Sequence, residues 1–225
     1  MTNVDEPPRG RSRGRPAVPM DRILSAAVEL LDEQGADALS MRSLAQRLQS
    51  GTATLYRHFA NRSELVSAVI DHILGEVDLD AESLAALPWQ EACITFAQHM
   101  FDALSRHGNV AVLLIEYTPV GTNALANREL CLSVLLANGF RPSVAAHAYA
   151  MLARYVLGFA IQLSGSAAGD DESDAQLSAV FRRLDPSRYP ATVAVADDLP
   201  VPLDDEFAFG LRLIVAGLEQ LRSGA

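Results

Sequence analysis

Twenty residues, 40–59, constrain the fold more than any other part of this 225-residue chain. Apolar residues in the first half follow the i, i+3, i+4 and i+7 spacing of a short amphipathic helix: Met41, Leu44, Ala45 and Leu48. Ser40 precedes this helix as a capping residue, a break at Gln49-Ser50-Gly51 follows it, and a second short helix begins at Thr52. Two short helices joined by such a turn predict a helix-turn-helix, whose second helix lies in the major groove of DNA.

The composition favours a purely helical protein. Hydrophobic residues make up 49% of the chain and aromatic residues 6%, and the alternating Val, Ile and Thr runs that indicate strands are nearly absent. At this length the chain forms one large domain or two small ones. We therefore expect an all-α protein, with an N-terminal three-helix domain that contains the helix-turn-helix and a larger C-terminal helical domain.

The charge is divided unevenly along the chain. Residues 1–62 carry nine Arg and seven acidic residues, whereas residues 63–225 carry nine Arg and 21 acidic residues, and there is no Lys. This asymmetry fits a DNA-facing N-terminal part on an acidic body that does not compete for phosphate. A solvated acidic protein with an incidental basic tail is the alternative, and the charge alone does not choose between the two.

The first 19 residues form a basic arm that we expect to be disordered, because they contain too few apolar residues to bury. Arg13 and Arg15 are the arm residues predicted to contact DNA. Gly14-Arg15-Pro16 is similar to the core of an AT-hook, which reads the minor groove through arginine. Non-specific contact with phosphates is the favoured interpretation, and minor-groove reading remains open.

The remaining helices can be placed from periodicity and capping signals. A helix over 21–34 braces the helix-turn-helix, and Asn61 with Glu64 makes a capping-box-like start for a connecting helix. We therefore expect a helix-turn-helix domain over 20–65, a connecting helix and linker over 66–87, and the larger domain over 88–225. Within the larger domain, helices are predicted over 89–106, 110–117, 123–138, 142–164, 175–184 and 204–221.

Two of these helices are candidates for a homodimer interface. The run 143–163 is apolar enough to raise the question of a membrane span, but His147, Arg154 and Gln162 make insertion costly, so no membrane is expected. The final helix has a heptad-like apolar spacing suited to packing against another helix: Phe207, Leu211, Ile214, Leu218 and Leu221. We favour a four-helix bundle made by two subunits, and the alternative is that both helices fill the core of the monomer.

Three N-terminal segments together resemble the DNA-binding domain of TetR-family transcriptional repressors: Ile23–Gly35, Ser43–Leu48 and Thr54–Leu65. Phe207–Glu219 is similar to the last helix of the tetracycline-repressor type of C-terminal domain. The resemblance implies a homodimer that binds an operator through the N-terminal domain. It also implies that residues 88–225 bind a ligand and dimerise, and that the ligand releases the DNA.

The resemblance also assigns residues of the reading head. It implies that Arg42 reaches a guanine and that Tyr56 and Arg62 contact phosphates. Chemistry agrees for Arg42, because its guanidinium can grip guanine N7 and O6, and for the Thr and Ala side chains, which can meet thymine methyl groups. The DNA-contacting candidates in the head are Arg42, Thr52, Ala53, Thr54, Tyr56, Arg57, His58 and Arg62.

Two features depart from the family pattern. The turn usually carries glycine and then a buried aliphatic residue, where this chain has Gln49 and Ser50. If the turn keeps its left-handed geometry, Gln49 bears a strain of order 1 kcal/mol. The histidines with which tetracycline repressors bind drug and magnesium are not matched, so no metal or other cofactor is expected.

The resemblance further implies an effector pocket among the helices of residues 89–164. The candidate lining residues combine apolar or aromatic side chains with a few polar groups: Phe96, His99, Met100, Glu116, Tyr117, Tyr149, Tyr155, Phe159 and Gln162. Aromatic residues at helical spacing more often belong to a core, so about half of this set is expected to line the pocket. The effector is predicted to be small and hydrophobic or aromatic.

No catalytic motif stands out, so an enzyme is not expected. A helical enzyme with an unrecognised site and a ligand-binding protein without an operator are the alternative functions. Cys93 and Cys131 lie in apolar helical stretches and no signal peptide precedes them, which favours buried free thiols in the cytoplasm over a disulfide.

Overall fold

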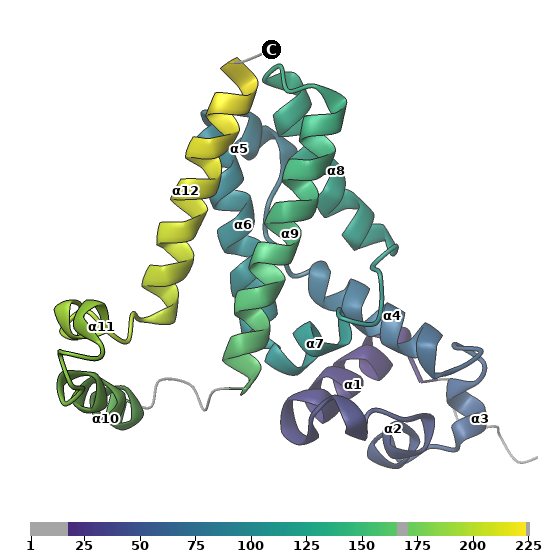
Figure 1. Ribbon diagram of the computed structural model, residues 1–225. Coiled ribbons are helices and arrows are strands. Elements are labelled where there is room, and N and C mark those ends of the chain that lie inside the picture. The colour runs from purple at the N-terminus through teal and green to yellow at the C-terminus, as the bar shows by residue number, and fades with distance from the viewer. Residues whose placement is uncertain (1–17, 166–170, 224–225) are drawn as a thin grey trace, which may run out of the picture.

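The computed structural model describes residues 18–165 and 171–223, and these contain helices and no strands. The N-terminal elements are α1 (Met20–Gln34), the single-turn η1 (Ala36–Ala38), α2 (Met41–Arg47), α3 (Thr52–Leu55) and the connecting helix α4 (Arg62–Leu74). Together α1 to α3 form a compact head at the lower right of Figure 1, and α4 leads from it toward the rest of the molecule. The predicted all-α architecture with a separate helix-turn-helix head is confirmed.

The larger body contains α5 (Ala81–Ala85), α6 (Trp89–Arg106), α7 (Gly108–Leu113), α8 (Thr122–Ala137), α9 (Pro142–Gly165), α10 (Asp171–Arg182), α11 (Pro190–Ala194) and α12 (Leu203–Ser223). Helices α6, α8, α9 and α12 run lengthwise through the body, whereas α10 and α11 lie apart from it at the lower left of Figure 1. The long predicted helices are confirmed to within a few residues. The sequence missed α5 and α11, because five-residue helices are too short to show periodicity.

Local signals explain why the head folds as it does. Ser40 caps α2 in a reciprocal capping box with Ser43, whose backbone N lies 3.1 Å from the Ser40 Oγ. Asn61 caps α4 and accepts a hydrogen bond from the backbone N of Glu64 at 3.0 Å. Both predicted caps are therefore confirmed. Leu44 on α2 and Leu55 on α3 are fully buried in the same hydrophobic core.

The turn between α2 and α3 keeps the left-handed geometry despite its unusual residues. Gln49 has φ of +49° and is the non-glycine residue with positive φ in the described chain, as predicted. The N–H of Ser50 donates to Ala45 O at 2.9 Å and the N–H of Gln49 donates to Gln46 O at 3.0 Å. These two bonds make a Schellman motif that satisfies the carbonyls at the end of α2. Ser50, which stands where the family usually has a buried aliphatic residue, has its Oγ buried with no hydrogen-bond partner in the described residues.

Replacing Ser50 with alanine is expected to stabilise the protein. The substitution removes a buried hydroxyl without a partner and leaves the backbone bonds of the turn intact, so the free energy of unfolding should rise by about 1 kcal/mol. Urea unfolding of the two proteins measures the difference. Ser50→Thr, which keeps the hydroxyl, is the control and should bring no such gain. Destabilisation by Ser50→Ala, with Ser50→Thr close to the wild type, would show that the Oγ contributes to the fold.

An aromatic cluster joins three helices of the body. The Phe101 and Phe207 rings stack at 4.4 Å between centroids, and Tyr155 and Phe159 pack against Phe207 at 5.3 Å each. The Tyr155 hydroxyl donates to Phe207 O at 2.8 Å, and Gly210 lets α12 approach this hydroxyl because a Cβ there would collide with it. The cluster therefore fixes α12 against α6 and α9.

Helix α9 has the length and apolar character of a membrane span over Pro142–Gln162, and 33% of its most apolar window is buried within the molecule. The charged and polar residues predicted to prevent insertion, His147, Arg154 and Gln162, are all exposed on it. The predicted heptad residues Phe207, Leu211 and Leu218 of α12 are buried in the core of the monomer, as the alternative expected. Helix α12 leaves another apolar face exposed. Phe209, Leu213 and Leu221 on this face are each more than half exposed.

Candidate functional site

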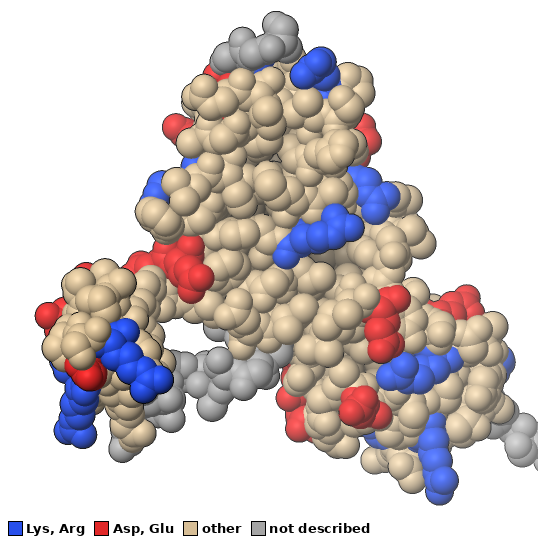
Figure 2. Space-filling model, viewed as in Figure 1, with Lys and Arg blue, Asp and Glu red and all other residues tan. Residues whose placement is uncertain are grey.

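The reading head presents polar and basic residues around the start of α3. Arg42, Thr52, Ala53 and Arg57 are exposed, Thr54 and His58 are partly buried, and the Tyr56 side chain is 56% exposed. Arg42 and Arg57 make no ion pair within the part of the chain that the structure describes. Blue basic side chains project from this region at the lower right of Figure 2. Two arginines and several hydroxyl groups are thus free to meet DNA.

Arg47 belongs to the same head but is occupied. Its guanidinium pairs with Glu33 at 2.6 Å and with Glu29 at 3.0 Å, both on α1. The hydrogen bond from Arg47 holds the pKa of the Glu33 carboxyl below its usual range, and the two carboxylates raise the pKa of Arg47. This exposed network orients α2 on α1 and leaves Arg47 neutralised.

Arg62 lies at a different place from the other DNA-binding candidates. Its Nε donates to Leu39 O at 2.7 Å, and its Nη2 donates to Ala36 O at 3.3 Å. Its Nη1 lies 3.5 Å from the Tyr117 hydroxyl. In this structure Arg62 therefore joins α4, the segment before α2 and the body, and its contact with phosphate remains a prediction. Arg13 and Arg15 lie outside the described residues.

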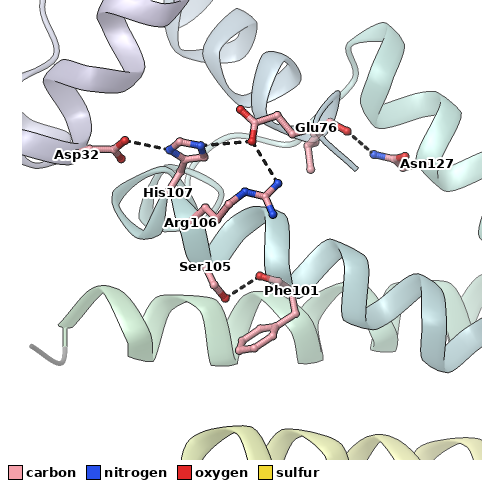
Figure 3. Close-up of polar contacts among 8 residues, drawn as sticks. Asp32, Glu76, Phe101, Ser105, Arg106, His107 and Asn127 are labelled. Carbon is pink, nitrogen blue, oxygen red and sulfur yellow. Dashed lines mark hydrogen bonds and ion pairs between the residues drawn. The ribbon is translucent and has the colours of Figure 1, made fainter. Parts of the chain in front are cut away.

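The head and the body meet at a polar junction beneath α4 (Figure 3). Nδ1 of His107, at the corner between α6 and α7, lies 2.9 Å from the Asp32 carboxylate on α1, and its Nε2 lies 3.4 Å from Glu76. Arg106 donates to the same Glu76 carboxylate at 3.2 Å. Asn109 adds a hydrogen bond to Leu31 O at 3.0 Å. The corner after α6 is thus tied to α1 and to the end of α4.

Helix α8 also contacts the end of α4. Asp71 on α4 accepts a hydrogen bond from the backbone N of Ala124 at 2.9 Å and so caps α8, whose own N-cap is Gly121. The buried Asn127 amide donates to Leu74 O at 2.8 Å. These contacts satisfy backbone groups at both helix ends and clamp α4 to α8.

A cavity of about 320 Å³ lies directly beside this clamp. Helices α4, α6, α8 and α9 and the segment after α7 line it, mostly with apolar side chains. Leu74, Ala124 and Asn127 belong both to the cavity wall and to the contact between α4 and α8. The volume falls within the range of small-molecule sites.

Comparison with known proteins identifies the relatives of this chain. Residues 86–222 match the family described as "Tetracyclin repressor-like, C-terminal domain", and residues 23–69 match "Bacterial regulatory proteins, tetR family". The chain belongs to the TetR family. A "HTH-type transcriptional regulator" of Saccharopolyspora erythraea is 33% identical over 214 residues, which cover 94% of this chain and 89% of the relative. This chain is accordingly a transcriptional regulator.

Solved TetR-family structures share the fold. Apo ActR from Streptomyces coelicolor has a TM-score of 0.83 and 30% identity, and the alignment covers 94% of this chain and 99% of ActR. The complex of ActR with actinorhodin has a TM-score of 0.79 and 31% identity, and covers 90% of this chain and 97% of that chain. Ligand-bound relatives of the same fold support a ligand-responsive regulator here.

The cavity brings together only part of the residue set predicted for effector binding. Phe96, Met100 and Tyr149 line it. His99, Glu116, Tyr117, Tyr155, Phe159 and Gln162 do not. Three of the nine residues therefore line the cavity, which is fewer than the half that was expected.

Three of the six have clear structural roles or positions instead. Tyr155 and Phe159 form the aromatic cluster with α12, where burial and the nearby Glu206 raise the pKa of Tyr155 and keep its hydroxyl a donor. Glu116 is exposed. Tyr155 and Phe159 lie four residues apart on one face of α9, and that face meets α12 and not the cavity.

Sequence reasoning named Arg154 as a possible polar contact, and it lines the cavity, but it missed Asn127 and Arg128 on α8. Apolar residues are spread around the whole circumference of α8, so its sequence shows no face to which a site could be assigned. No group of three His, Cys, Asp or Glu side chains within the described ranges is placed to hold a metal ion.

Proposed function

We propose that this TetR-family protein is a repressor that binds a palindromic operator as a homodimer and releases it when a small apolar effector fills the cavity. The observation that supports the proposal is that the cavity wall and the contact between α4 and α8 share residues. Leu74, at the end of the helix that carries the head, lines the cavity and accepts the hydrogen bond of Asn127. An effector that displaces this wall acts on α4, and α4 positions the head.

Dimerisation is supported by the unpartnered apolar faces of α9 and α12. Met151 on α9 is 41% exposed, and it lies with Leu218 and Leu221 of α12 in a shallow groove between the two helices. Exposed apolar patches on a helix pair are buried when a second copy adds its own pair to make a four-helix bundle. A dimer also supplies the two heads that a palindromic operator needs. We place the protein in the cytoplasm, acting on DNA without catalytic activity.

Selection from random double-stranded DNA followed by gel-shift measurement tests the proposal. The protein should enrich a palindrome and bind it with an affinity that falls steeply as salt concentration rises, because bound arginines release counterions. Failure to enrich any palindrome at low salt would leave the ligand-binding protein without an operator as the better account.

Replacing Arg42 with alanine is expected to relax specificity at one base pair in each half-site. If the exposed Arg42 guanidinium grips a guanine, the loss is roughly 1–3 kcal/mol for the preferred base and little for the other bases. Gel shifts with operators substituted at each position measure this. Arg22→Ala, at an exposed position of α1 outside the predicted DNA-contacting set, is the control and should keep the wild-type specificity. An equal loss for every operator variant would make Arg42 a phosphate contact.

A further inference from the structure

The charged residues that line the cavity are of one sign. Among its lining residues only Arg128 and Arg154 are charged, and no Asp or Glu lines it. Neither guanidinium makes an ion pair within the described chain. Figure 2 shows blue side chains over α8 and α9 surrounded by tan surface. A mostly apolar cavity in an acidic protein therefore presents two uncompensated positive charges.

Arg128 is held in a fixed position. Its Nε donates to the Tyr149 hydroxyl at 3.3 Å, and its Nη2 donates to Pro119 O at 3.3 Å. The guanidinium carbon also lies 5.6 Å from the centre of the Tyr149 ring. The Nη1 group makes no hydrogen bond to the described residues. Arg128 is thus half-buried, oriented by three contacts, and left with free donors at the cavity.

A guanidinium in such a setting favours a carboxylate. Its planar donors match the two carboxylate oxygens, and partial removal from water makes an unpaired charge costly. Arg154 donates within its own helix to Ala150 O at 3.2 Å and is exposed, so it adds charge at the mouth and not a second fixed clamp.

We propose that the cavity takes an organic anion, with a carboxylate on a flat apolar or aromatic body and that carboxylate bound by Arg128. The apolar body lies among the Phe96, Met100 and Leu152 side chains. This inference specifies the chemical class of the effector and rests on the proposed function of the cavity. Its ligand preference is nevertheless measurable without any operator.

Two matched probes test the charge requirement: anthracene-2-carboxylate and the neutral anthracene-2-carboxamide. Their ring systems are identical and suit a cavity of about 320 Å³. Titration calorimetry with the full chain should show the carboxylate binding roughly ten- to a hundred-fold more tightly than the amide. Equal affinities, tighter binding of the amide, or no binding of either probe at millimolar concentration would overturn the proposal.

Arginine variants test which side chain causes the preference for the carboxylate. Arg128→Gln should reduce the ratio of the two affinities to near one while the amide still binds, and Arg154→Gln should reduce it less. Arg141→Gln, an exposed residue outside the cavity wall, is the control and should keep the wild-type ratio. A preference that survives the Arg128 and Arg154 substitutions together would place the anion elsewhere. The comparison of the two probes on the wild-type protein tests the charge requirement even if a variant fails to fold.

Gel shifts separate this inference from the proposed function. If the protein prefers the carboxylate but binds no operator, the proposed anion site is supported and the proposed repressor function is contradicted. If a neutral effector releases the operator as readily as its carboxylate analogue does, the proposed anion site is contradicted and the proposed repressor function is supported.

Discussion

Substituting Leu213 with arginine is expected to convert the proposed dimer into monomers and to abolish tight operator binding. The Leu213 side chain is 58% exposed on α12, so the arginine costs the isolated subunit little. At the proposed two-fold interface the same change places one guanidinium group from each subunit against apolar side chains, where neither is solvated. Two linked heads bind more tightly than separate heads by about 10²–10⁴-fold, and this gain is lost with the dimer.

Sedimentation and gel shifts measure the two consequences together. Leu125→Arg is the matched control, because Leu125 is 48% exposed on α8 and belongs to neither of the two helices proposed for the interface. The control should remain dimeric with wild-type operator affinity. If Leu213→Arg stays dimeric, the interface lies elsewhere. If it becomes monomeric and still binds the full operator tightly, the two heads bind without coupling through α9 and α12.

Cys93 and Cys131 are expected to react with thiol reagents more slowly in the native protein than in the unfolded protein, by three orders of magnitude or more. Their side chains are 1% and 2% exposed. Burial raises the pKa of Cys93 from an ordinary 9.0 to about 12, and burial with the neighbouring Cys93 raises that of Cys131 further. Since the thiolate is the reactive form, a three-unit rise alone lowers its fraction at pH 8 about a thousand-fold.

Reaction with a chromogenic disulfide at pH 8 measures this in native and guanidinium-unfolded protein. Ser67→Cys places a thiol at an exposed position of α4 and serves as the control, with one fast thiol and two slow ones. Fast reaction of both Cys93 and Cys131 in the native protein would show that α6 and α8 open beside the cavity wall.

The same shifts set a pH dependence for stability. A thiol whose pKa is raised on folding stabilises the native state below its unfolded pKa of about 9 and loses this contribution as pH rises toward 12. The free energy of unfolding should therefore decline above about pH 9. Urea unfolding across this range, compared with Cys93→Ala, checks the sign.

Local signals predicted the head well because its structure is specified locally. Ser40 and Asn61 act as caps, and Gln49 adopts the left-handed turn that the spacing requires. Each of these depends on backbone groups within a few residues. Arg62 shows the limit, because its partners Leu39 and Ala36 lie 23 and 26 residues away in the chain.

The amino-acid sequence by itself determined the long helices, the caps of α2 and α4, the helix-turn-helix and the family. Only the tertiary structure decided which residues face the cavity. Periodicity places Phe96, Tyr155 and Phe159 on apolar faces, but it does not say whether such a face meets α12 or a cavity. Arg128 becomes part of a site because Pro119 and Tyr149, from two other segments, meet it. Burial and hydrogen bonding between distant segments are properties of the packed chain, and no local pattern encodes them.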